Sequence, residues 1–121
     1  MKKIIGRHVA IGALAALAGF AATARADVVG NAKAGRDKVA MCIGCHGIPD
    51  YRAAYPEVYH VPMLGGQNAA YIENALRGYK KGDRRFPTMH AIASSLTEQD
   101  IADVAAYYAA QTATSKNNPE R

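Results

Sequence analysis

The sequence predicts an all-α domain with three main helices and short helical turns between them. Apolar residues recur at helical spacing in the segments 31–44, 69–81 and 97–112. A residue suited to an N-cap opens each segment, because its side chain can accept a hydrogen bond from a free N–H of the first turn. No segment shows the alternation of a convincing β-strand. The length of 121 residues favours a single domain.

The first 26 residues have the pattern of a secretory signal peptide. An apolar run, 9–22, follows a basic start and is shorter than the about 20 residues that a spanning helix needs. Small residues at the −3 and −1 positions favour cleavage after Ala26 over an uncleaved membrane anchor. We therefore expect export to a periplasm and no stable membrane insertion of the mature chain, 27–121. The basic residues of the start are Lys2, Lys3 and Arg7.

Cleavage of this signal peptide would change the net charge of the protein. The full sequence has 15 basic and 10 acidic side chains and a net charge of +5. Four of the basic residues and none of the acidic residues precede Asp27, so the mature chain carries 11 and 10, a net charge of +1. A domain so close to neutrality lacks the basic patch typical of nucleic-acid binding. We expect no nucleic-acid partner.

The first predicted helix begins after Asn31, a favourable N-cap, and runs to about Gly44. Gly35 falls inside it, where glycine costs about 1 kcal/mol relative to alanine. A missing Cβ allows another backbone to approach closely. Gly35 therefore predicts either a close helix crossing or a tolerated defect.

At the end of this helix stands the pattern Cys-x-x-Cys-His, formed by Cys42, Cys45 and His46. Such a pattern is typical of covalent haem attachment: two thiols add to the two vinyl groups of a porphyrin, and the adjacent imidazole binds the iron. A dithiol redox site would be expected beside a βαβ unit, and a zinc site needs about four ligands at matched spacings. Neither context is visible, so haem c is the favoured cofactor.

A long connection, 47–66, follows the motif and shows no clear period. Segments of this length without secondary structure are usually functional or disordered, and the aromatic content argues against disorder. We interpret it as a loop over the edge of the cofactor, with tyrosines that mainly serve packing. Its prolines and tyrosines are Pro49, Pro56, Pro62, Tyr51, Tyr55 and Tyr59.

The later helices have clear boundaries. Asn68 is suited to cap a helix at 69–81, and Gly82 is suited to end it. Residues 89–93 are expected to form one short helical turn. The segment 97–100 resembles a capping box that opens a last helix running to about Thr112, followed by a frayed polar tail, 113–121.

An iron bound by His46 needs a second ligand or keeps an open face. The candidates are Met41, Met63, Met89, His60 and His90. Met41 adjoins an anchoring cysteine and cannot easily reach the opposite face. Met89 is favoured because the chain has room to wrap round the ring before reaching it, and a thioether ligand favours ferrous iron. Met63 and the two histidines stay open as alternatives.

The mature chain resembles the class I cytochromes c, and in particular the small bacterial c4, c5 and c553-type domains. The likeness covers nearly all of 31–112. The residues that carry it are Gly35, Cys42-Ile43-Gly44-Cys45-His46, Pro62-Met63-Leu64-Gly65-Gly66-Gln67, Tyr71, Gly82, Arg84, Pro87-Thr88-Met89 and the segment 96–108.

The resemblance implies a small cytochrome c fold wrapped round one covalent haem c. Cys42 and Cys45 would carry the thioethers, with His46 and Met89 as the iron ligands. The carbonyl of Pro62 would accept a hydrogen bond from the other nitrogen of His46. Gly35 and Val39 would cross the last helix at Val104 and Tyr107. The remaining residues expected at the haem are Gly65, Gln67, Tyr71 and Arg84.

The favoured function is that of an electron carrier, not an enzyme, that exchanges single electrons with redox protein donors and acceptors. It would act as a monomer or in transient complexes. Two alternatives stay open: a haem subunit of a larger oxidoreductase, and a peroxide- or gas-reactive haem protein with an open sixth position. A basic rim could dock an acidic partner, or one of its arginines could bind a haem propionate. The residues of this rim are Lys80, Lys81, Arg84 and Arg85.

Overall fold

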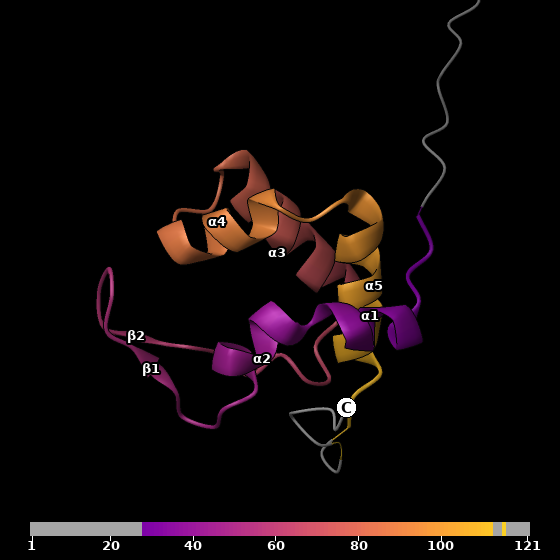
Figure 1. The fold of residues 1–121 in the computed structure, drawn as a ribbon, viewed down its shortest axis with the longest axis horizontal. Helices are drawn as coiled ribbons and strands as arrows, with labels where there is room; N and C mark the ends of the chain where they lie inside the picture. The colour runs from indigo at the N-terminus through magenta and orange to yellow at the C-terminus, as the bar shows by residue number, and fades with distance from the viewer. Residues whose placement is uncertain (1–27, 113–114, 116–121) are drawn as a thin grey trace, which may run out of the picture.

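The computed structural model describes residues 28–112 and residue 115, and it is mostly helical, as predicted. The signal peptide and most of the tail predicted from the sequence lie outside these residues. None of the helices in the described part combines the length and apolar character needed to cross a membrane. The elements, shown in Figure 1, are α1 (Ala32–Lys38), α2 (Ala40–His46), β1 (Arg52–Ala53), β2 (Tyr59–His60), α3 (Ala69–Lys81), α4 (Pro87–Ser94) and α5 (Glu98–Ala109).

The first helix is divided in two, which the sequence did not predict. Asn31 caps α1 as expected and accepts from the backbone N–H groups of Lys33 and Ala34. At Val39, a ψ of 7° interrupts the helical geometry, and α2 starts at the next residue. Val39 is fully buried. The break lets Val39 stay in the core beside α5 while α2 leads away from α5 (Figure 1).

The crossing of α1 and α5 depends on glycine. A Cβ added to Gly35 would lie 2.0 Å from the carbonyl oxygen of Asp103 and 2.8 Å from the Cβ of Tyr107. Gly30, just before α1, would clash with the carbonyl oxygen of Ala102 in the same way, at 2.1 Å. The crossing predicted from Gly35 is confirmed, and Gly30 is a second contact that the sequence did not reveal.

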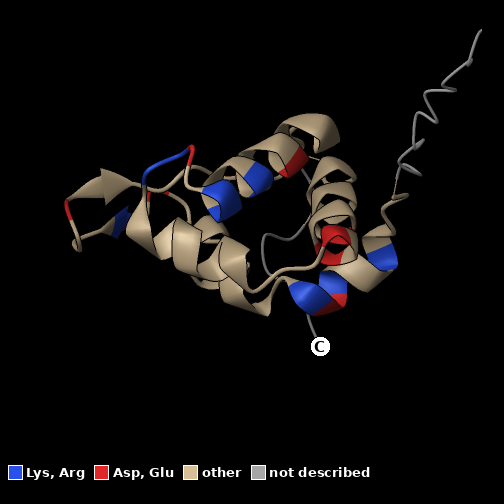
Figure 2. Cartoon of the chain, turned by 90° about the horizontal axis from the view of Figure 1, so that it is seen from above, with Lys and Arg blue, Asp and Glu red and all other residues tan. Residues whose placement is uncertain are grey.

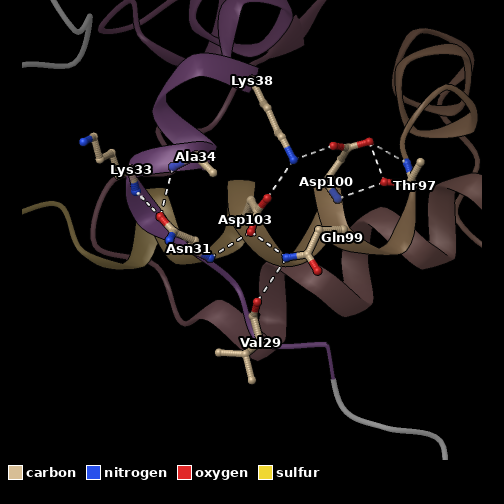
Figure 3. A network of polar contacts seen from close by, with 9 residues as sticks. All are labelled: Val29, Asn31, Lys33, Ala34, Lys38, Thr97, Gln99, Asp100 and Asp103. Carbon is tan, nitrogen blue, oxygen red and sulfur yellow. Dashed lines mark hydrogen bonds and ion pairs between the residues drawn. The ribbon is translucent and has the colours of Figure 1, made fainter.

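A buried carboxylate joins α1 to α5 (Figure 3). Asp103 is buried and accepts from the backbone N–H of Asn31 at 2.8 Å, from Lys38 Nζ at 2.7 Å and from Gln99 Nε2 at 2.8 Å. Lys38 also pairs with Asp100 at 2.7 Å. Hydrogen bonds from Lys38 are the largest cause that lowers the pKa of both carboxyls. The charge is tolerated in the interior because it is paired and hydrogen-bonded on every side.

The core lies where α3, α4 and α5 meet α1. Helix α3 packs against both α4 and α5, and α1 packs against α5. Ile72 and Leu76, one turn apart on α3, face this core, whereas Tyr71 beside them is exposed. The other buried members are Val39, Ala93, Leu96, Ile101, Val104, Ala105 and Tyr108.

The boundaries of α3 agree with the prediction, with Asn68 accepting from the N–H of Tyr71 and Gly82 in the left-handed region at φ 86°. The capping box at the start of α5 is also present, formed between Thr97 and Asp100. Helix α5 ends at Ala109, about a turn earlier than predicted. Helix α4 is longer than the single predicted turn, because Pro87 opens it at a position that needs no N–H donor.

The connection 47–66 is not free of strands, which corrects the interpretation of this segment as a plain loop. Arg52 pairs with His60 and Ala53 with Tyr59 in a short antiparallel hairpin. The N–H of Val61 donates to the carbonyl of Tyr51 at 2.9 Å and continues the pairing. Strands of two residues are too short for an alternating pattern to be recognised in sequence.

Candidate haem-binding site

Helix α2 carries the two cysteines and the histidine of the motif. Cys42 and Cys45 are half-buried and are not joined in a disulfide. They lie three residues apart on one helix, so their side chains project from the same face. Both sulfurs can therefore reach one edge of a flat group, while His46 closes the same helix.

The alternatives to haem fit this geometry poorly. Burial, with a smaller contribution from Cys45, raises the pKa of the Cys42 thiol to about 11. Dithiol redox sites instead depend on a lowered pKa that exposes a thiolate. No three His, Cys, Asp or Glu residues in the described part of the chain gather in a metal-binding group. A structural zinc ion would need about four such ligands.

His46 is held in one orientation by a backbone carbonyl. Its Nδ1 lies 2.7 Å from the carbonyl oxygen of Pro62, so Nδ1 carries the proton and donates it. This hydrogen bond is the one that the family resemblance implied. It leaves Nε2 as the ring nitrogen with a lone pair for a metal. It also makes the imidazole a stronger electron-pair donor to that metal.

The candidates for a second iron ligand have different environments. Met89, in the first turn of α4, is half-buried and packs against the core, whereas Met63 and Met41 are 40% and 54% exposed. His90 Nδ1 lies 2.7 Å from the carbonyl oxygen of Tyr79, which fixes its ring against α3. His60 is exposed on the hairpin, with its Nε2 3.5 Å from Asp50.

The glycine turn after Pro62 packs on the end of α5. A Cβ on Gly65 would lie 2.6 Å from Oε1 of Gln111, and Gly66 adopts a φ of 78° and donates to the carbonyl of Tyr108 at 2.9 Å. Gln67 accepts from the N–H of Asn68 at 2.8 Å. The structure thus gives Gly65 and Gln67 local contacts, and their expected haem contacts stay predictions.

Arg84 interacts with two tyrosines of α3, Tyr79 and Tyr71. Its guanidinium is 4.7 Å from the ring centroid of Tyr79, and a side-chain hydrogen bond to Tyr71 is the largest cause that raises its pKa. The absence of a Cβ at Gly78 makes room for the aliphatic part of Arg84, which would lie 3.1 Å from such an atom. Arg84 is therefore fixed beside Tyr71, another residue predicted to line the haem.

Tyr108 adds a feature that the sequence did not reveal. Its side chain is buried, and its hydroxyl has no hydrogen-bond partner among the described residues. Burial raises its pKa, and the neighbouring Cys42 adds to the effect. An orphaned hydroxyl beside an anchoring cysteine is costly unless another group completes the site. Together with the fixed ring of His46 and the paired thiols, it fits a site completed by a cofactor.

A sequence model of the family described as Cytochrome c matches residues 32–110. The chain belongs to the cytochrome c family. Cytochrome c-554(548) of Halomonas halodenitrificans is 41% identical to it over 85 residues, which cover 68% of this chain and 98% of that protein. Cytochrome c4 of Pseudomonas aeruginosa is 37% identical over 89 residues, covering 74% of this chain and 42% of that protein.

The fold agrees with the sequence comparison. The crystal structure of reduced recombinant cytochrome c4 from Pseudomonas stutzeri matches with a TM-score of 0.57 and 33% identity, over 69% of this chain and 47% of that one. This cytochrome c thus spans less than half the length of the cytochrome c4 relatives and nearly all of cytochrome c-554(548). As a member of the family, it is an electron-transfer protein with covalently bound haem c, for which Cys42 and Cys45 are the available thiols.

Proposed function

We propose that this cytochrome c is a single-electron carrier in which His46 and Met89 would both bind the haem iron. The observation that carries the proposal is the hydrogen bond from His46 Nδ1 to the Pro62 carbonyl at 2.7 Å. It directs a defined lone pair to a metal at the residue next to the paired thiols. When bound, haem c supplies an iron that takes up and releases one electron.

The chain itself contributes attachment, orientation and exclusion of water. Cys42 and Cys45 would hold the porphyrin through two thioethers, so that it cannot diffuse away after export. Pro62 keeps the imidazole of His46 in one tautomer and one orientation, so that its Nε2 would be available to bind the iron. A fixed set of iron ligands would keep the reorganisation energy of electron transfer small.

Met89 is the proposed second ligand. Its half-buried position against the core makes a defined side-chain geometry possible, whereas Met63 is 40% exposed. A thioether is soft and neutral, and His/Met ligation raises the reduction potential. With both His46 and Met89 as ligands, the iron would have no open position for oxygen or peroxide, as a carrier requires and a gas-reactive protein does not.

We further propose that the mature protein works in a periplasm with a redox protein donor and acceptor. The basic rim predicted for docking is smaller than expected, because Lys80 donates to the carbonyl of Leu96 and Arg84 is held over Tyr79. Lys81 and Arg85 are exposed at the end of α3 and in the turn that follows, where basic residues gather (Figure 2). These two are the proposed docking charges.

A Met89→Ala variant tests the ligation, with Met63→Ala as the matched control. The unmutated protein should show the sulfur-to-iron charge-transfer band when oxidised and should not bind carbon monoxide rapidly when reduced. Met89→Ala should lose the band and gain rapid carbon monoxide binding, and Met63→Ala should change neither. Persistence of the band in Met89→Ala would assign the ligand to Met63. Rapid carbon monoxide binding by the unmutated protein would favour the open-site alternative.

The carrier proposal also differs from that of a subunit fixed in a larger oxidoreductase. The native mass of the protein in a periplasmic extract separates the two. A free carrier is expected at the mass of the mature chain with its haem, and a stable complex at high mass would contradict it.

A further inference from the structure

The tyrosine-rich hairpin makes one aromatic contact across the molecule. The ring of Tyr59, in β2, lies 5.0 Å from the ring of Phe86, centroid to centroid, with the planes tilted by 44°. Tilted pairs at this distance are favourable arrangements of aromatic quadrupoles. Tyr59 is 44% exposed, so the contact is at the surface, and the core does not require it.

On one side, Tyr59 is tied to the residue that fixes His46. It is paired with Ala53 across the hairpin, and two residues later Val61 is buried and donates to Tyr51. Pro62, the next residue, accepts the hydrogen bond from His46. The hairpin is therefore held by its own hydrogen bonds and leads directly into Pro62, which orients the imidazole of His46.

On the other side, Phe86 directly precedes α4. It is the N-cap residue of that helix, and its carbonyl accepts from the N–H of His90 at 2.9 Å. Met89 lies in the first turn, three residues after Phe86. The other end of this turn is held by His90 on the carbonyl of Tyr79. Phe86 thus lies within one helical turn of Met89, and its backbone is hydrogen-bonded into that turn.

We propose that Tyr59 and Phe86 are positioning residues that clasp the Met89 end of α4 to the hairpin behind His46, and so keep Met89 from being displaced. The proposal rests on the proposed function, because it takes Met89 as the iron ligand. The clasp joins the segment that carries Met89 to the hairpin that precedes Pro62, the hydrogen-bond partner of His46.

The expected effect is a change in ligand exchange. An external ligand reaches the iron only in molecules from which Met89 has detached, so its apparent affinity follows the detached fraction. An aromatic pair contributes a favourable free energy beyond that of its buried area, and this contribution corresponds to a factor of about 2 to 10 in the equilibrium between attached and detached Met89. Loss of the clasp should therefore tighten binding of an external ligand by about 2- to 10-fold.

The test is a titration of the oxidised holoprotein with imidazole. Tyr59→Ala and, independently, Phe86→Leu should each bind imidazole about 2- to 10-fold more tightly than the unmutated protein. Tyr59→Phe keeps the ring and should restore the original affinity. Tyr55→Ala is the matched control, because Tyr55 lies on the same hairpin and is 84% exposed. The double variant should add little to either single change, since both remove the same contact.

Two outcomes overturn the proposal in distinguishable ways. The Met89→Ala variant should bind imidazole far more tightly than any clasp variant. If it binds like the unmutated protein, Met89 is not the ligand, and the proposed function fails together with the clasp. If Met89→Ala tightens binding but Tyr59→Ala and Phe86→Leu behave like Tyr55→Ala, the clasp alone is wrong.

Discussion

Replacement of Gly35 by alanine should break the contact between α1 and α5. The added Cβ would lie 2.0 Å from the carbonyl oxygen of Asp103 and 2.8 Å from the Cβ of Tyr107. Both partners are fixed, one as helix backbone and the other as the first atom of a side chain. Relief therefore requires the helices to separate by about 1 Å or more, because close-packed interiors do not deform locally. Separation would also pull Val39 out of its contacts in the core.

The loss in the free energy of unfolding at Gly35 can be compared with the gain that alanine brings when it replaces a glycine in an open helix position. Overpacking of this kind costs about 1–3 kcal/mol and occasionally more, and two rigid clashes place Gly35→Ala at about 3 kcal/mol. Gly44 is the matched control, because it is also inside a helix and a Cβ there would meet no atom of the described residues within 4 Å. Gly44→Ala should be neutral or stabilising by up to about 1 kcal/mol. The two variants should thus differ by about 3–4 kcal/mol.

The measurement is chemical unfolding of the holoproteins at pH 7, followed by far-ultraviolet circular dichroism. In thermal unfolding, about 3 kcal/mol in a domain of this size corresponds to a Tm lower by roughly 12–24 °C. If the free energies of unfolding of the two variants agree within about 0.5 kcal/mol, the crossing is not as close as described, and the assigned role of Gly35 is wrong.

Two further predictions concern charged residues. The lowered pKa of Asp103 means that its contribution to stability is present above the ordinary carboxyl pKa of about 4 and is lost as the pH falls toward the folded pKa. Asp103→Asn should therefore lower the free energy of unfolding by about 1–3 kcal/mol at pH 7 but by much less near pH 2, as measured by chemical unfolding at both pH values. An equal loss at both pH values would exclude the ion pair with Lys38 as the source of the effect. Separately, replacing Lys81 and Arg85 together by glutamate should slow oxidation of the reduced protein by ferricyanide about 2- to 10-fold at low salt, with little effect at high salt. Replacing Lys33 and Arg36, on α1, together by glutamate is the control, because it changes the net charge by the same amount. An equal effect there would mean that net charge alone matters and that no docking site exists.

Features that depend on near neighbours in the chain were predicted from the sequence with good accuracy. The caps at Asn31 and Asn68, the left-handed end at Gly82 and the capping box opened by Thr97 all formed as expected. Each is a hydrogen bond or a backbone conformation within a few residues, so its energetics are largely local. The motif that ends at His46 belongs to the same class, because three groups on one helix have a fixed geometry.

Other features were decided by contacts that no local pattern encodes. The break at Val39 allows a buried side chain and a departing helix to coexist, although the local spacing favoured one continuous helix. The hairpin around Tyr59 depends on pairing across several residues of loop and on a ring of a distant turn. The orphaned hydroxyl of Tyr108 follows from burial on α5, and sequence periodicity only predicts that the residue faces inward.

The sequence by itself thus determined the chemistry of attachment, because the thiols and imidazole on α2 are adjacent in the chain and need no partner to be recognised. It also drew attention to Gly35, where the local pattern left either a close crossing or a tolerated defect open and the family resemblance implied the crossing. The orientation of His46 was implied by the family resemblance and not by the local pattern, and only the tertiary structure decided what holds the segment behind it. Those properties depend on atoms far apart in sequence, namely Pro62 against His46 at 2.7 Å and Phe86 against Tyr59 at 5.0 Å. They exist only once the chain has closed on itself.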